Sequence, residues 1–154
     1  MVICVITLTV AYAILIQNLD INGVASVKKS EWNIHFTNVL SPQASGHATG
    51  GNTTLNEKKT VLTITDGTFL APGDKIVYTF DIVNKGNIPA ILSAAPVIST
   101  PTCTSTDTVS ATNICANDLV YTLTYVDGSQ INNGDTLAAG ETKKAKLTLS
   151  LKNE

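Results

Sequence analysis

A strict alternation of apolar and polar residues marks the middle of the chain, over residues 76–83. Ile76, Tyr78, Phe80 and Ile82 fall on one face, and Val77, Thr79, Asp81 and Val83 fall on the other. A period of two that is rich in β-branched and aromatic residues predicts a strand with one buried face. Turn sequences flank it, Pro72-Gly73-Asp74 before and Asn84-Lys85-Gly86-Asn87 after. The pattern therefore predicts a central antiparallel strand.

Shorter stretches of the same kind lie on both sides of this strand. They are 32–36, where Trp32, Ile34 and Phe36 are expected to face the core, 61–65, 119–125, and the C-terminal 145–151 with Ala145, Leu147, Leu149 and Leu151 inward. Residues 88–99 are apolar but carry Pro89 and Pro96, which predicts an edge or bulged strand. Residues 41–56 are rich in Gly, Ser and Thr and predict an exposed loop.

Many short strands separated by turn signals, with no pattern of a soluble amphipathic helix, indicate an all-β protein. We expect an antiparallel β-sandwich of the immunoglobulin-like kind, with seven or eight strands. This domain would span residues 19–154. Residues 1–18 form a separate apolar segment.

The N-terminal segment carries no charge before Asp20. Its apolar run, residues 1–16, is shorter than the roughly 20 residues that a spanning helix needs. Ala11-Tyr12-Ala13 matches a secretory cleavage pattern, but no basic residue precedes Lys28, so we expect the segment to be retained. An unbroken apolar run favours a helix, and a strand that completes an open sheet edge is the alternative. The residues expected to make the assembly contact are Val2, Ile3, Val5, Ile6, Leu8, Val10, Ile14, Leu15 and Ile16.

The composition of the chain argues against several classes of function. Charged residues make up 14% of the chain, the net charge is −2, and all 10 basic residues are lysine. A nucleic-acid groove or a phosphate clamp is therefore not expected, because arginine usually dominates such sites. No nucleophile elbow, phosphate loop or paired-carboxylate pattern is present. We accordingly expect no enzymatic activity, no cofactor and no small-molecule substrate.

Two cysteines bound a Thr-rich excursion. Cys103 and Cys115 are predicted to form a disulfide, since the chain has the character of an exported protein. The alternative is a pair of free, buried thiols. Cys4 lies in the apolar run and is expected to act as a small hydrophobic residue.

Candidate metal ligands are sparse. His35 and His47 are the only histidines, and neither stands in a zinc-binding motif. Oxygen-bearing side chains gather in one loop and could bind calcium, although their spacing is not that of an EF-hand and suits turns equally well: Asp127, Ser129, Asn132, Asn133 and Asp135. Lys28, Asp81 and Asn153 have the residue types of a lysine–asparagine crosslink with an acidic helper. We expect no metal site.

Three motifs behind the apolar segment are similar to those of surface filament proteins: Ala71-Pro72-Gly73-Asp74, Tyr78-Thr79-Phe80 and Asn84-Lys85-Gly86. The arrangement resembles the camelysin and TasA-type biofilm-fibre proteins and also the archaeal-type type IV pilins. The first resemblance implies a β-sandwich completed by the N-terminal strand of a neighbouring subunit. The second implies an apolar helix in a filament core.

Taken together, these patterns predict a structural subunit of an extracellular or cell-surface filament, exported across the cytoplasmic membrane. Its partners would be other copies of itself, and the membrane before assembly, with hydrophobic contact through the N-terminal segment as the mechanism. The alternative is a membrane-tethered adhesion or binding module that uses loops such as 41–56 and 102–117. A camelysin-like protease is a third option, for which no zinc ligands are visible.

Overall fold

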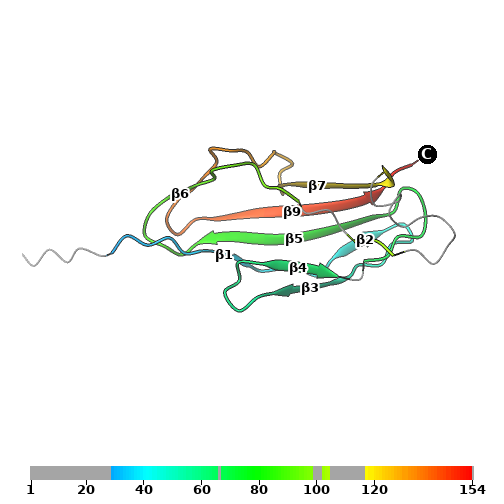
Figure 1. Cartoon of the computed structure of the whole chain (residues 1–154), viewed down its shortest axis with the longest axis horizontal. Helices are drawn as coiled ribbons and strands as arrows, with labels where there is room; N and C mark the ends of the chain where they lie inside the picture. The colour runs from blue at the N-terminus through cyan, green and yellow to red at the C-terminus, as the bar shows by residue number, and fades with distance from the viewer. Residues whose placement is uncertain (1–28, 66, 99–101, 105–116, 154) are drawn as a thin grey trace, which may run out of the picture.

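The computed structural model describes residues 29–65, 67–98, 102–104 and 117–153. The strands of this part of the chain are β1 (Ile34–Thr37), β2 (Gln43–Ser45), β3 (Asn52–Leu55), β4 (Leu62–Thr65), β5 (Lys75–Asn84), β6 (Ala90–Ile91), β7 (Leu119–Tyr125), β8 (Thr136–Leu137) and β9 (Thr142–Leu151) (Figure 1). The longest of them, β5 and β9, run side by side along the long axis of the molecule.

The main sheet has the strand order β1-β5-β9-β7, with β2 also paired to β5. All of its pairings are antiparallel. The central strand β5 has neighbours along both edges, with β9 on one side and β1 and then β2 on the other. The alternation of residues 76–83 therefore marks the middle of the sheet, as the sequence predicts.

The register gives the sheet one apolar face. Phe80 lies beside Ala145 of β9, which in turn lies beside Tyr125 of β7. One row further along, Tyr78 lies beside Leu147 of β9, which lies beside Leu123 of β7. The opposite face carries threonine and lysine, for example Thr79 beside Lys146 and Thr124. The inward face predicted for residues 145–151 is thus the apolar face of the sheet.

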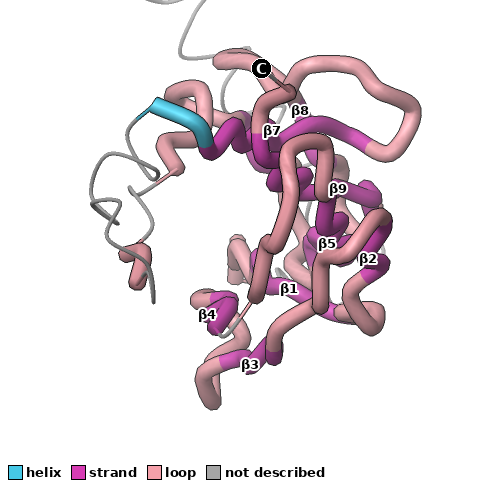
Figure 2. Tube along the Cα trace, turned by 90° about the vertical axis from the view of Figure 1, so that its right-hand side faces the viewer, coloured by secondary structure: helices cyan, strands magenta, loops and turns pink. Residues whose placement is uncertain are grey.

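The core lies on this apolar face. Phe80, Ile131 and Ala145 form the buried cluster, and half-buried side chains pack against it from the sheet and from outside it: Phe36, Val39, Leu62, Ile82, Leu92, Leu123, Tyr125 and Leu147. Phe36 meets Phe80 edge to face, with ring centroids 5.4 Å apart. Two small antiparallel ribbons, β3–β4 and β6–β8, accompany the sheet. In the end-on view, β3 and β4 lie on the β1 side and β7 lies at the other margin (Figure 2).

Three expectations were wrong in detail. Trp32 does not face the core, because its side chain is 68% exposed and its indole N–H donates to the Pro89 carbonyl at 3.2 Å. Within residues 88–98, only Ala90–Ile91 forms a strand, which is consistent with two prolines interrupting the ladder. The predicted loop 41–56 contains β2 and β3, whose threonine and serine residues form strands at the margin of the fold.

The prediction of an all-β, antiparallel fold is confirmed for the described residues, whose elements are strands apart from a fragment of helical turn at residues 117–118. The two-layered sandwich stays a prediction. No helix in the described ranges is long and apolar enough to cross a membrane.

Candidate interaction surface

The edge of the main sheet at β7 is the most distinctive surface of the domain. One side of β7 pairs with β9 along the whole strand, and no strand in the described part of the chain pairs with its other side. Its sequence, Leu-Val-Tyr-Thr-Leu-Thr-Tyr, contains neither a charge nor a proline. Natural proteins use charges and prolines to keep sheet edges from pairing with other chains. The β7 edge lacks these protective residues.

The outward hydrogen-bonding groups of β7 can be assigned from its C-terminal end. The Tyr125 amide donates to the Ser129 carbonyl at 3.0 Å, on the side away from β9. Backbone groups alternate in direction along a strand, so Tyr121 and Leu119 also direct their N–H and C=O groups outward. No described residue pairs with the outward groups of these two residues. A further strand could therefore bind there through main-chain hydrogen bonds.

The side chains of these same residues continue the apolar face. Leu119 lies beside Leu151 of β9, and Tyr121 lies beside Leu149. All four are half-buried and lie outside the core cluster, whereas Leu123 and Leu147 pack against it. The apolar face is thus covered over β5, where Ile76 beside Leu149 is fully buried, and only partly covered towards β7. We call Leu119, Tyr121, Leu149 and Leu151, together with the outer edge of β7, the β7 surface.

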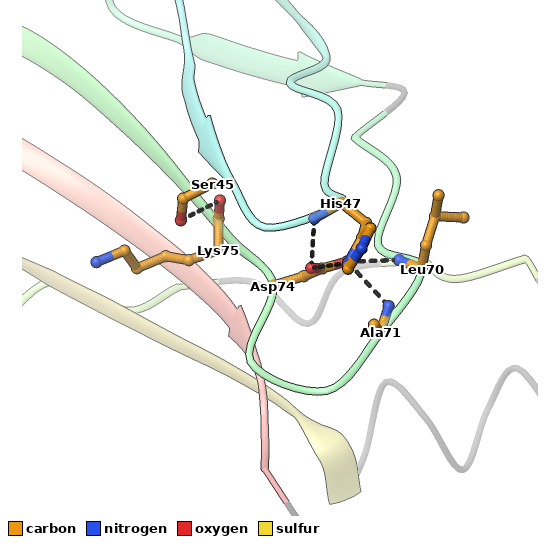
Figure 3. Close-up of polar contacts among 6 residues, drawn as sticks. All are labelled: Ser45, His47, Leu70, Ala71, Asp74 and Lys75. Atoms are coloured by element: carbon orange, nitrogen blue, oxygen red, sulfur yellow. Dashed lines mark hydrogen bonds and ion pairs between the residues drawn. The ribbon is translucent and has the colours of Figure 1, made fainter.

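The aspartate of the Pro-Gly-Asp turn is a buried structural residue. Asp74 is 1% exposed, and its carboxylate accepts hydrogen bonds from the amides of His47 (2.7 Å), Leu70 (2.8 Å) and Ala71 (2.9 Å) (Figure 3). The His47 imidazole lies 3.6 Å from the same carboxylate. These contacts, led by the His47 amide, lower the pKa of Asp74 below 3.8. Asp74 therefore fixes the loops at the start of β5.

The other end of β5 is fixed by Asn84, which is fully buried. Its side-chain amide donates to the carbonyls of Ile88 (2.8 Å) and Leu137 (3.2 Å), and its side-chain oxygen accepts from the Gly86 amide (3.0 Å). A Cβ at Gly86 would lie 2.1 Å from the Glu31 carbonyl oxygen, so only glycine fits there. The Asn-Lys-Gly-Asn motif therefore joins residues 29–33, β5 and β8.

The proposed oxygen cluster does not converge. Asp127 accepts from the amide and hydroxyl of Ser129, while Asp135 accepts from the Asn132 amide and the Tyr125 hydroxyl. Each carboxylate stabilises its own turn. Partial burial and then the bond to Asp135 raise the pKa of Tyr125 to about 12. Within the described ranges, no group of three or more His, Cys, Asp or Glu side chains could hold a metal ion.

A shallow pocket of about 390 Å³ lies beside this turn. It is lined by Tyr125, Val126, Asp127, Ser129, Lys143 and Lys144. The Lys143 ammonium lies 5.3 Å from the centre of the Tyr125 ring, so a cation–π contact already uses one face of the aromatic side chain.

The crosslink candidates do not come together either. Asp81 accepts from the Asn38 side chain at 3.1 Å and lies beside Lys144 in the register. Asn153 follows the end of β9 and has its side-chain oxygen near Gly73, at the opposite end of β5. Lys28 lies outside the described residues.

The remaining predicted site residues fall partly outside the structure. Cys103 is disulfide-bonded, whereas Cys115 lies outside the described residues, so the pairing of these two cysteines stays a prediction. The nine assembly residues lie in the segment 1–28, which is also outside them. Sequence reasoning missed the β7 surface, although the signal was present in a seven-residue strand without charge or proline.

Comparisons with the profiles of known protein families, with curated proteins and with solved structures found no match.

Proposed function

We propose that this chain is the structural, non-enzymatic subunit of an extracellular or cell-surface filament. In this proposal the apolar segment 1–18 of one copy adds a strand to the outer edge of β7 in the next copy and extends the main sheet there. The single observation that carries the proposal is the uncharged outer edge of β7, with which no strand of the described residues pairs, beside a partly covered apolar face. Such an edge is a ready template for another chain.

The pattern of the N-terminal segment supports this partner. Residues 5–10 are Val-Ile-Thr-Leu-Thr-Val, and residues 120–125 within β7 are Val-Tyr-Thr-Leu-Thr-Tyr. A strand over 5–10 would place Ile6, Leu8 and Val10 on the apolar face and Thr7 and Thr9 on the threonine face. Because the same pattern forms a strand in β7, we favour a strand over a helix for residues 5–10 in the assembled state.

The direction of the chain favours a second copy as the acceptor. Residues 29–33 lie at the Asn84 end of β5, where the Glu31 carbonyl accepts from the Asn87 amide at 3.1 Å. Leu119 and Leu151 lie at the other end of the sheet, where the Lys75–Ser150 pair also lies. The described chain therefore begins at the end of the sheet opposite the β7 surface of its own copy, which suits head-to-tail assembly.

Two substitutions at one position test this function in the full-length protein. Tyr121→Pro removes an outward amide of β7, whereas Tyr121→Ala, the matched control, removes the ring but keeps that amide. We expect the purified parent protein to form filaments in electron micrographs, Tyr121→Ala to form fewer, and Tyr121→Pro to form none. Equal assembly by the two variants would contradict pairing at β7.

Deletion of residues 1–18 tests the donor segment. We expect the truncated protein to form no filaments. If it still polymerises, or if the full-length protein stays monomeric once freed from membrane, the filament proposal fails. A full-length protein that stays monomeric would favour the membrane-tethered binding module, since the head of such a module is monomeric with or without the segment.

A further inference from the structure

The end of the domain at which the described chain begins carries two large, exposed apolar side chains. Trp32 and Ile91 are each 68% exposed. They lie close together, because the Trp32 indole N–H donates to the carbonyl of Pro89, two residues before Ile91. We call Trp32, Pro89 and Ile91 the Trp32 tip. In Figure 1, β6 and the start of the described chain lie at the same end of the molecule.

Hydrogen bonds hold the Trp32 tip in place. The Lys85 amide donates to the Asn33 carbonyl at 2.8 Å, and the Asn87 side chain bonds the Glu31 amide and the Lys29 carbonyl, each at 2.8 Å. The strand-like segment 29–33 is thus fixed against 85–87. The exposed indole is a property of the folded domain, since its neighbours on both sides in the chain are anchored.

From these observations we infer that the Trp32 tip docks onto the surface of a lipid bilayer. Residues 29–31, which follow the apolar segment in the sequence, lie beside the tip, so a segment held in lipid would bring the tip towards the membrane surface. Tryptophan is enriched at that depth because its ring is apolar while its N–H is polar. Lys29 and Lys85 are exposed at the same end, with Lys28 adjacent in sequence and Glu31 as the acidic residue of the segment. Lysines at such a site favour an anionic surface.

This inference rests on the proposed function and on the predicted contact of the subunit with the membrane before assembly, for which it names a contact site. The apolar run of residues 1–16 is shorter than the roughly 20 residues that a spanning helix needs, so a second contact with the bilayer would add to its anchoring. The Trp32 tip would supply that contact before the subunit joins a filament. It would also orient the domain, because docking at the tip leaves the far end of β7 away from the membrane.

Trp32 is the only tryptophan of the protein, so intrinsic tryptophan fluorescence reports on this contact alone. Full-length protein is bound to vesicles of phosphatidylcholine and phosphatidylglycerol whose acyl chains carry bromine at chosen depths, and Trp32 fluorescence is recorded. We expect emission at shorter wavelength than in lipid-free protein, and strongest quenching by bromine near the headgroups. No quenching, or quenching strongest at the bilayer centre, would overturn the inference. Lipid-free protein that already emits at this shorter wavelength would also overturn the inference, since the ring would then be buried in protein.

Two matched substitutions separate the tip from the rest of the surface. Ile91→Ser removes an exposed side chain of the tip, and Leu70→Ser removes one that is 71% exposed near the opposite end of β5. We expect Ile91→Ser to lower the affinity of the protein for these vesicles about tenfold, because one isoleucine side chain no longer leaves water on binding. Leu70→Ser should leave this affinity unchanged. Equal effects would overturn the assignment. Filament formation by the same variants is scored separately in electron micrographs, so failure of the tip and failure of the filament proposal are distinguishable.

Discussion

At the scale of single residues, two polar side chains at the ends of β5 have a different role from the one their sequence suggests. Asp and Asn beside Gly are common surface turn formers. Here Asp74 and Asn84 are both buried and hydrogen-bonded to residues far away in sequence, His47 and Leu137. The buried polar groups are satisfied, which is the condition under which such groups are tolerated in a core.

We predict that Asp74→Asn destabilises the protein at neutral pH, because an amide oxygen is a weaker acceptor for the three backbone amides than a carboxylate. The pKa of Asp74 is lowered in the folded state. The ionised carboxylate therefore contributes its full stabilisation of the fold above about pH 3.8, and this contribution is lost as the pH falls through the pKa of the folded state. Urea unfolding from pH 7 to pH 2.5 checks this. The difference between parent and variant should shrink below about pH 3.8, and a constant difference would contradict the assignment.

At the scale of elements, β5 organises the sheet through its two unlike faces. Phe80 is 6% exposed and contacts the Phe36 ring, whereas Thr79 points to the face that carries lysine and threonine. Near the Asn84 end, however, Asp81 and Val83 are also buried on that second face. The polar face is therefore covered in part.

Phe80→Ala and Thr79→Ala form a matched pair within this strand. We expect the first to lower the free energy of unfolding by roughly 3–5 kcal/mol through cavity formation, and the second by less than about 1 kcal/mol. Denaturant titration of the purified variants measures both. Similar losses would mean that the two faces of β5 have been assigned incorrectly.

The elements that could be predicted from the sequence are those whose pattern depends on one buried face. β5, β7 and β9 alternate cleanly and lie where expected. Trp32 alternates in the same way yet is exposed, because periodicity does not show whether another layer covers a given end of a strand. The β7 surface depends on strand order, which no local pattern contains. The buried position of Asp74 depends on the His47 loop closing over it, which is a long-range contact.

At the scale of the whole molecule, the disulfide predicted to close the Thr-rich loop can be tested. Cys103 is disulfide-bonded, and Cys115 is its predicted partner. We expect one alkylatable thiol in the unreduced, unfolded protein and three after reduction, with peptide mapping that links Cys103 to Cys115 and leaves Cys4 free. Reduction should cost roughly 2–3 kcal/mol of stability, as for a short closed loop. A Cys4–Cys103 link, or three free thiols before reduction, would contradict this pairing.

The strand order also determines when the domain can fold during its synthesis. β5 is complete at Asn84, but the partner for its second edge, β9, begins only at Thr142. At a ribosomal rate of roughly 5–20 residues per second, the intervening residues 85–141 take several seconds to emerge. During that interval the nascent chain exposes a ten-residue strand with an apolar face and an open edge. Holdase chaperones that bind such strands should therefore associate with this polypeptide before its last strand is made, and release it afterwards.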